Sequence, residues 1–269
     1  MDTRYWGPSG WRLLHLISFA PQRSAARAEA VCRFFEVLPY VLPCKYCRHS
    51  LSSYYDADPP ECAVREERLP RWLWRIHNDV NAKLRRQGLK GVSAAKDADP
   101  PFAKVRSFYE ARLAAGCSRT VFEGWEFLFS VAESHPFGRQ GRVSTPIEGH
   151  PPMEELAKAT PLERNMWNVM EPAERLPYYN LFWKLLPDVL PFSEWSVAWK
   201  EAAAATQEPA TVCRADCLKG VWAIRRAMEE KLELLNQTTY ASLCKELRTY
   251  RSGCGLGARG KTCRRKRGT

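Results

Sequence analysis

The chain has 269 residues and a formal net charge of +11, with 45% hydrophobic and 26% charged residues. This length suits one large domain or two small ones. No apolar run reaches the ~20 residues that a membrane-spanning helix needs. The first residues also lack the basic start and apolar core of a signal peptide. We therefore expect that the protein is made in a cytosol-like compartment and has no contact with a membrane.

The first 117 residues alternate helical patterns with proline-rich breaks. Ser9 is the expected N-cap of a first helix that carries Trp11, Leu14 and His15 on one face. Further helices are predicted over 25–38, 44–55, 69–86 and 102–115, separated by proline and glycine. Because no alternating strand pattern occurs, this part is predicted to be all-α.

Residues 118–252 form a second predicted region, which is also helical. A Pro/Gly-rich loop over 135–152 interrupts it. Its predicted helices are 118–134, 153–170, 173–186, 191–205, 215–235 and 240–250. The many aromatic residues here most simply form a core. We predict a helical C-terminal domain of unknown role, followed by a flexible tail over 253–269.

The tail carries much of the positive charge. The last eleven residues include six Lys or Arg and no acid. Such a run is usually a solvated segment, and contact with nucleic acid or an acidic partner is the functional alternative. A G-x-G-x-x-G pattern over 255–260 has no preceding strand and no following helix, so it does not indicate a dinucleotide site.

Ten cysteines indicate thiol chemistry or metal binding, because structural disulfides are rare in reducing compartments. Cys44 and Cys47 form a C-x-x-C pair. Haem attachment needs a histidine where Arg48 stands, and a zinc site needs a second pair, which Cys213 and Cys217 offer only far along the chain. A thioredoxin-like site needs β-strands. The pattern therefore favours a redox pair without metal, at a helix N-terminus that stabilises a thiolate.

The helix predicted over 69–86 carries a polar cluster. His77 and Asn81 are i, i+4 neighbours, and Asn78 lies three residues before Asn81. The zinc-protease pattern H-E-x-x-H is absent. A polar network that closes a helical bundle is one interpretation. The other is a polar heteroaromatic ligand with many donors and acceptors.

Three segments have a characteristic order and spacing: W-G-P-S-G-W-R-L-L-H at 6–15, P-C-K-Y-C at 43–47 and H-N-D-V-N-A-K-L at 77–84. Together they resemble the Erv/ALR family of FAD-dependent sulfhydryl oxidases. The first and third segments look most like the versions carried by large cytoplasmic DNA viruses. The resemblance covers about residues 5–115. It implies a bundle of four helices plus a short fifth that holds FAD, usually as a homodimer. It implies that the flavin is lined by Gly7, Trp11, His15, His77, Asn78, Val80, Asn81, Lys83 and Tyr109.

The resemblance also implies a mechanism. Cys44 would be the exposed cysteine that meets thiol-containing protein substrates, and Cys47 would lie against the flavin. Electrons would pass through FAD to molecular oxygen, giving hydrogen peroxide. The expected location is the cytoplasm of a host cell or a virion. The alternative function is a non-enzymatic helical adaptor that binds zinc or nucleic acid.

Two features depart from the family pattern. Trp74 stands where a bracing cysteine often occurs, and no cysteine follows it until Cys117. We therefore expect the brace to be absent or rebuilt. Many members relay electrons through a mobile shuttle pair. Cys254 and Cys263 on the tail are candidates for that role, and Cys213 with Cys217 is a second candidate pair.

Overall fold

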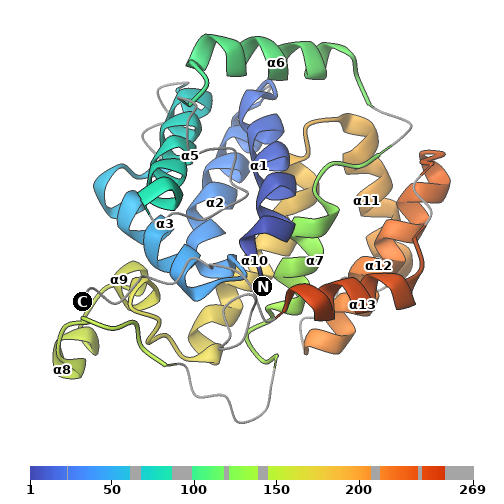
Figure 1. Ribbon diagram of the computed structural model, residues 1–269. Coiled ribbons are helices and arrows are strands. Elements are labelled where there is room, and N and C mark those ends of the chain that lie inside the picture. The colour runs from blue at the N-terminus through green and yellow to red at the C-terminus, as the bar shows by residue number, and fades with distance from the viewer. Residues whose placement is uncertain are drawn as a thin grey trace.

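The computed structural model describes residues 1–22, 24–60, 68–86, 99–117, 121–138, 145–206, 213–235 and 238–251, and these contain twelve α-helices and no strand. The predicted all-α class is confirmed. Figure 1 shows α1 near the centre, α6 across one end, and α11 to α13 along one side. The helices before residue 117 are α1 (Thr3–Phe19), α2 (Ala25–Val41), α3 (Lys45–Ala57), α5 (Leu69–Arg86) and α6 (Phe102–Ala114). Those after it are α7 (Trp125–Glu133), α8 (Met153–Leu156), α9 (Pro161–Met166), α10 (Pro172–Val189), α11 (Ser193–Thr206), α12 (Arg214–Lys231) and α13 (Tyr240–Tyr250).

The first helix begins earlier than the sequence pattern suggested. Asp2 is its N-cap, and its carboxylate accepts a hydrogen bond from the backbone N–H of Arg4 at 2.9 Å. Pro8 lies inside the helix, which continues although proline has no N–H to donate one of the backbone hydrogen bonds. The expectation that Ser9 caps this helix was wrong. Ser9 instead accepts a hydrogen bond from the backbone N–H of Phe127 on α7, at 3.4 Å.

The second helix continues past a proline that was expected to end it. Pro39 has no N–H, so the carbonyl of Phe35 one turn earlier loses its helical partner. The Tyr55 hydroxyl of α3 donates to that carbonyl at 2.9 Å. The Asn165 side chain then donates to the Pro39 carbonyl at 3.0 Å. These contacts from other helices let α2 run to Val41.

The predicted helix over 153–170 is two short helices with a turn between them. Pro161 forces the residue before it out of the helical region, and Thr160 is extended there. The Thr160 hydroxyl accepts from the backbone N–H of Glu163 at 3.2 Å and begins α9. The predictions over 69–86 and 240–250 match α5 and α13.

Helices α2 and α10 pack against each other along their length and run antiparallel. At one end, the Arg27 guanidinium of α2 donates to the carbonyls of residues 188–190 at 2.8, 3.1 and 3.2 Å, which satisfies the last carbonyls of α10. At the other end, the rings of Tyr40 and Tyr178 stack with centroids 3.8 Å apart. This pairing ties the two regions of the chain together.

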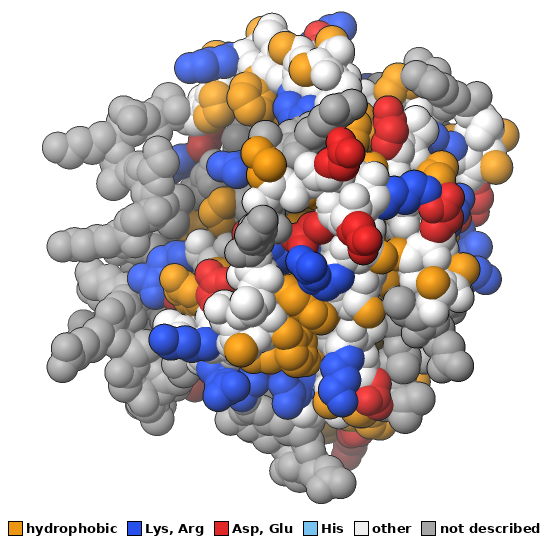
Figure 2. Space-filling view, turned by 90° about the vertical axis from the view of Figure 1, so that its right-hand side faces the viewer, with side chains coloured by type: hydrophobic (Ala, Val, Ile, Leu, Met, Phe, Trp, Pro, Cys, Tyr) orange, Lys and Arg blue, Asp and Glu red, His pale blue; other side chains and the backbone are white. Residues whose placement is uncertain are grey.

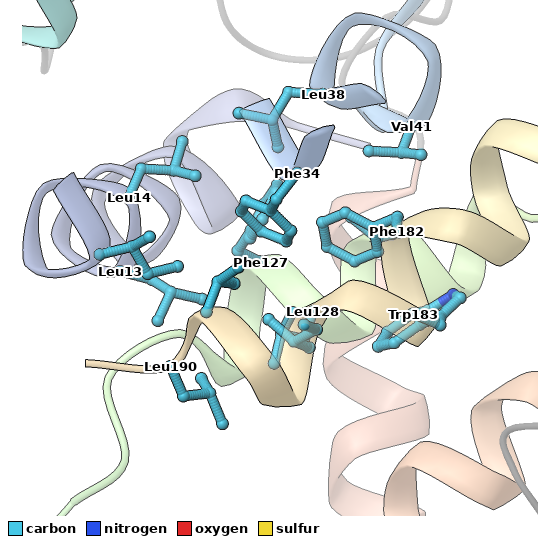
Figure 3. Close-up of a cluster of buried hydrophobic side chains, with 14 of the residues drawn as sticks. Leu13, Leu14, Phe34, Leu38, Val41, Phe127, Leu128, Phe182, Trp183 and Leu190 are labelled. Atoms are coloured by element: carbon cyan, nitrogen blue, oxygen red, sulfur yellow. The ribbon is translucent and has the colours of Figure 1, made fainter. Parts of the chain in front are cut away.

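The hydrophobic core is shared by helices from both regions. Figure 3 shows side chains of α1, α2, α7 and α10 meeting in one cluster. Phe182 of α10 lies at its centre, with its ring 5.2 Å from that of Phe34 and 6.1 Å from that of Phe127. The division into domains at 1–117 and 118–252 stays a prediction, and the tail over 253–269 lies outside the described residues.

The surface mixes charge types. On the face at the right of Figure 1, which carries α12, acidic, basic and apolar side chains of the described residues are interspersed (Figure 2). Within the described residues, we find no helix with the length and apolar character to span a bilayer.

Replacing Phe182 with Ala should test the shared core. Phe182 is fully buried, and loss of a buried Phe side chain typically costs about 3–5 kcal/mol of unfolding free energy. We expect urea unfolding of the F182A variant to show one transition, shifted as a whole to lower urea. The control F108A, at a side chain that is 63% exposed on α6, should stay within about 0.5 kcal/mol of the parent. Two transitions, of which only one shifts, would contradict a shared core.

Candidate functional site

One cavity of about 520 Å³ lies among α1, α3 and α5. Side chains of α2, α6 and α7 complete its walls, including Leu38, Tyr109 and Phe127. Its lining is mostly apolar, with a few polar groups from α3 and α5. Both its size and this balance are typical of a site for a small molecule or cofactor.

Most residues predicted to touch a flavin line this one cavity. They are Gly7, Trp11, His77, Val80, Asn81, Lys83 and Tyr109, and Cys47 of the C-x-x-C pair joins them. The rings of Trp11 and His77 stack with centroids 3.9 Å apart and an angle of 9° between them. The cavity therefore has a flat aromatic wall close to a cysteine.

His15 lies behind this wall and holds it in place. His15 Nε2 and His77 Nδ1 are 3.1 Å apart, so one ring donates a hydrogen bond to the other. The His15 ring also stacks on that of Tyr109, with centroids 5.0 Å apart. Burial, with the charge of His77, lowers the pKa of His15 to about 3, and burial lowers the pKa of His77 to about 4. Both imidazoles are therefore neutral near pH 7.

Asn78 does not reach the cavity. It lines a separate hollow of about 270 Å³ on the other side of α5, beside Trp74 and Tyr54. Successive residues of a helix point about 100° apart, which turns Asn78 away from His77. A contact between Asn78 and a flavin stays a prediction.

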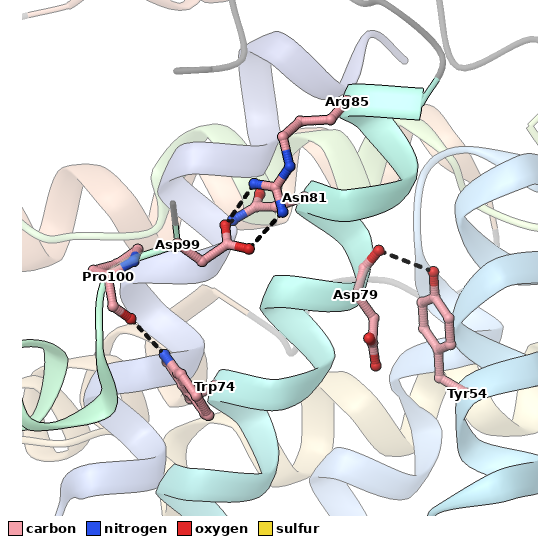
Figure 4. A network of polar contacts seen from close by, with 7 residues as sticks. All are labelled: Tyr54, Trp74, Asp79, Asn81, Arg85, Asp99 and Pro100. Atoms are coloured by element: carbon pink, nitrogen blue, oxygen red, sulfur yellow. Dashed lines mark hydrogen bonds and ion pairs between the residues drawn. The ribbon is translucent and has the colours of Figure 1, made fainter. Parts of the chain in front are cut away.

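A polar network positions α6 over the cavity (Figure 4). Asp99 accepts hydrogen bonds from the Asn81 amide at 3.0 Å and from two nitrogens of Arg85 at 2.8 and 2.6 Å. The hydrogen bond from Arg85, with help from Asn81, lowers the pKa of Asp99 despite partial burial. Trp74 donates from Nε1 to the Pro100 carbonyl at 2.9 Å. The Trp74 side chain thus holds the start of α6 by a hydrogen bond.

The C-x-x-C pair lies at the start of α3. Cys44 is the N-cap residue, and its carbonyl accepts hydrogen bonds from the backbone N–H groups of Cys47 at 3.0 Å and Arg48 at 2.9 Å. Cys47 is half-buried and lines the cavity. Cys44 is only 3% exposed, so the expectation of an exposed Cys44 was wrong. Chain from the second region lies over this turn, where Lys45 donates to the Thr145 carbonyl at 3.2 Å and Arg48 donates to Asn168 at 2.6 Å.

Among the cavity residues that were not predicted from the sequence are Ser50 and Phe127. The Lys83 ammonium donates to the Ser50 hydroxyl, which donates to the Tyr46 carbonyl at 3.0 Å. Ser50 follows Cys47 by three residues, so helical spacing could have found it. Phe127 comes from α7, and no local pattern connects it with the cavity.

The second candidate pair, Cys213 and Cys217, lies at the start of α12, and its shuttle role stays a prediction. Cys217 is fully buried, lies 3.0 Å from the Tyr179 hydroxyl, and has its pKa raised by burial to about 12. Cys213 donates to the Asp216 carboxylate at 2.9 Å. Cys254 and Cys263 lie outside the described residues, so their shuttle role stays a prediction. In the part of the chain that the structure describes, no three His, Cys, Asp or Glu side chains converge as metal ligands.

Comparison with known proteins gives a partial match. Residues 8–98 match the model of the Erv1 / Alr family. This segment is similar to the Erv1/Alr family. The mitochondrial FAD-linked sulfhydryl oxidase ERV1 of Saccharomyces cerevisiae is 32% identical over 87 residues, which cover 32% of this chain and 46% of that protein. The matched part is thus less than half of the relative's own length. No solved structure matches the chain. The Erv1/Alr-like segment, residues 8–98, contains both C-x-x-C cysteines but neither Tyr109 nor Phe127.

We predict that His77 contributes to the loss of stability in acid. The folded state keeps His77 neutral down to its pKa of about 4, whereas an unfolded histidine binds a proton below about pH 6.5. The unfolded state therefore binds more protons as the pH falls through this window, and the free energy of unfolding decreases. Between pH 7 and pH 5, the H77Q variant should lose about 1–2 kcal/mol less than the parent in urea unfolding. The control H150Q changes a histidine outside the cavity and should follow the parent. An equal loss in H77Q and the parent would contradict the prediction.

Proposed function

We propose that this protein is an FAD-dependent thiol oxidase that forms disulfides in protein substrates. The observation that carries the proposal is that Cys47 lines the same cavity as Trp11, His77 and Lys83. The likeness of residues 8–98 to the Erv1/Alr family, and to a relative named as an FAD-linked sulfhydryl oxidase, supports it.

The residues of the cavity fit FAD. Trp11 and Tyr109 offer aromatic faces for stacking on a planar ring, and the Lys83 ammonium suits a phosphate. The Trp6 indole N–H, on the cavity wall, is buried and has no hydrogen-bond partner among the described residues. A cofactor rich in acceptors would satisfy such a donor. When bound, FAD takes two electrons from a dithiol and passes them to molecular oxygen, which gives hydrogen peroxide.

The cysteines carry the thiol exchange. A substrate thiolate attacks the sulfur of Cys44, and Cys47 leaves as the thiolate at the wall of the cavity. The start of α3 favours this charge, because its free N–H groups and the positive end of its dipole face the pair. Since Cys44 is buried, a substrate thiol reaches it only after the chain over the first turn of α3 moves.

The remaining expectations are proposals from the resemblance. We propose a homodimer that acts on thiol-containing proteins in a host cytoplasm or virion. The matched relative is named as mitochondrial, so localisation of the tagged chain in infected or transfected cells would separate the two compartments. Contact of the tail with nucleic acid also stays a prediction, because the tail lies outside the described residues.

The purified protein should be yellow and should consume oxygen when given dithiothreitol. The C47S variant should keep its flavin absorbance but lose at least about 99% of turnover, because the sulfur at the cavity wall is removed. Oxygen uptake and peroxide release measure the turnover, and the visible absorbance measures the bound flavin. The control C244S changes a half-buried cysteine on α13 and should keep the parent rate. Colourless protein with bound zinc, or full turnover in C47S, would refute the proposed function.

Loss of the aromatic wall should weaken cofactor binding. We expect W11A to bind FAD about tenfold or more weakly than the parent, because stacking on the ring is lost. Titration of the apoprotein by flavin fluorescence measures the affinity. The matched control W222A removes a half-buried indole of α12 that does not line the cavity, and it should keep the parent affinity. Equal affinities in W11A and W222A would contradict this role for Trp11.

A further inference from the structure

Two arginines lie beside the C-x-x-C pair without an acidic partner. Arg48 is 6% exposed and donates to the Leu42 carbonyl at 3.1 Å and to the Asn168 side-chain oxygen at 2.6 Å. Arg175 of α10 donates to the Ser134 carbonyl at 3.4 Å, and the Ser134 hydroxyl donates to the carbonyl of Pro43, the residue before Cys44, at 3.4 Å. The acceptors of both guanidinium groups are neutral. Among the described residues, neither guanidinium forms an ion pair with a carboxylate.

The charges of these arginines are poorly compensated. The Nε–H of Arg48 and that of Arg175 are both buried and have no hydrogen-bond acceptor among the described residues. Burial lowers the pKa of Arg48, and burial together with the charge of Arg48 lowers the pKa of Arg175. Because guanidinium groups stay protonated in proteins, two of them buried together are costly unless an anion lies near.

The nearby groups that can supply this anion are the two cysteines. Arg48 follows Cys47 directly and lies one helical turn after Cys44, whose carbonyl accepts from the Arg48 backbone N–H at 2.9 Å. Burial is the main influence on the pKa of Arg48, and negative charge on Cys44 and on Cys47 opposes it. The guanidinium therefore lies within electrostatic reach of both sulfurs.

We propose that Arg48 and Arg175 form a cationic pair whose counter-ion is the thiolate produced when the Cys44–Cys47 disulfide is reduced. Arg175 lies outside the Erv1/Alr-like segment, so the second region of the chain would tune the chemistry of the C-x-x-C pair. The proposal rests on the proposed function for the disulfide step. The effect on the reduced thiols does not depend on bound flavin.

Reduction of the Cys44–Cys47 disulfide takes two thiol–disulfide exchange steps. A substrate thiolate forms a bond to Cys44 Sγ, and the bond between the two cysteines breaks with its electron pair on Cys47 Sγ. A second substrate thiolate then attacks the substrate sulfur of the mixed disulfide and releases Cys44 Sγ. The substrate loses two electrons, and the C-x-x-C pair gains them. The two substrate protons go to the released sulfurs or, where a thiolate persists, to water.

Other charged or titratable groups near α3 either add to this positive charge or are engaged elsewhere. Lys45 of α3 donates to Thr145, and His49 Nδ1 lies 2.9 Å from the Met166 carbonyl. Lys83 of α5 donates to Ser50. On α2, the charge of Glu36 contributes to the raised pKa of Tyr40 and of Tyr55. Arg164 of α9 forms an ion pair with Glu174 of α10. Burial raises the pKa of Tyr179 on α10 well above its usual value.

The pH dependence of thiol alkylation tests the proposal. The reduced full-length protein is treated with iodoacetamide between pH 5 and 9, and the rates at Cys44 and Cys47 are read by peptide mass spectrometry. R175M removes the charge and keeps much of the side-chain length. We expect it to raise the midpoint of at least one cysteine by about one pH unit, which makes alkylation roughly tenfold slower below the midpoint. R175K keeps the positive charge, so its midpoints should stay close to those of the parent.

The controls separate electrostatics from folding. R106M removes an exposed arginine of α6 that is paired with Glu110, and it should leave both midpoints unchanged. If R175M does not fold, R175Q takes its place, with the same expected shift. An unchanged midpoint in a folded R175M or R175Q variant would overturn the proposal.

Flavin content and oxygen uptake of the same samples distinguish the two proposals. A parent protein that binds no FAD, but whose thiols shift in R175M, would refute the oxidase function alone. A protein that turns over with FAD, but shows no shift in R175M, would refute the role of the arginines alone.

Discussion

The packing of α2 against α10 is the contact on which the candidate site depends. One face of α2 places Leu38 on the wall of the cavity, while Phe34 packs against Phe182 of α10. Burial of a side chain such as Phe182 contributes about 1.5–3 kcal/mol. The chain then leaves α2 at Val41 and reaches the C-x-x-C pair within three residues. A shift of α10 would therefore move both the core and the cysteines.

The same packing explains why the start of α3 is so positive. Two carboxylates of the second region form ion pairs with arginines other than Arg48 and Arg175. Glu174 pairs with Arg164, and Glu133 of α7 pairs with Arg214 and Arg251. Arg175 is thus left without an acidic partner among the described residues, within electrostatic reach of Arg48. The local charge follows from which acids α7 and α10 present, which the overall net charge of the chain does not reveal.

Local patterns predicted much of the fold and of the site. The bounds of α5 and α13 follow from proline, glycine and helical periodicity, and the spacing of His77 and Asn81 places both on the cavity face. Features that depend on distant contacts were missed. The continuation of α2 past Pro39 needs the hydroxyl of Tyr55 from another helix. Asn78, which the resemblance implies on the flavin, lines a separate hollow because adjacent helical residues point in different directions.

The burial of Cys44 and the position of Arg175 have to be considered together, because one region of the chain causes both. Removal of water alone raises the pKa of a thiol and makes it unreactive. Cys217 shows this effect within the same molecule, since burial raises its pKa to about 12 and its hydrogen-bond partner is the neutral Tyr179 hydroxyl. An adjacent cation typically lowers a pKa by about 1–3 units, which is comparable with the effect of burial. The region that covers Cys44 therefore also supplies the charge that would keep the covered pair reactive.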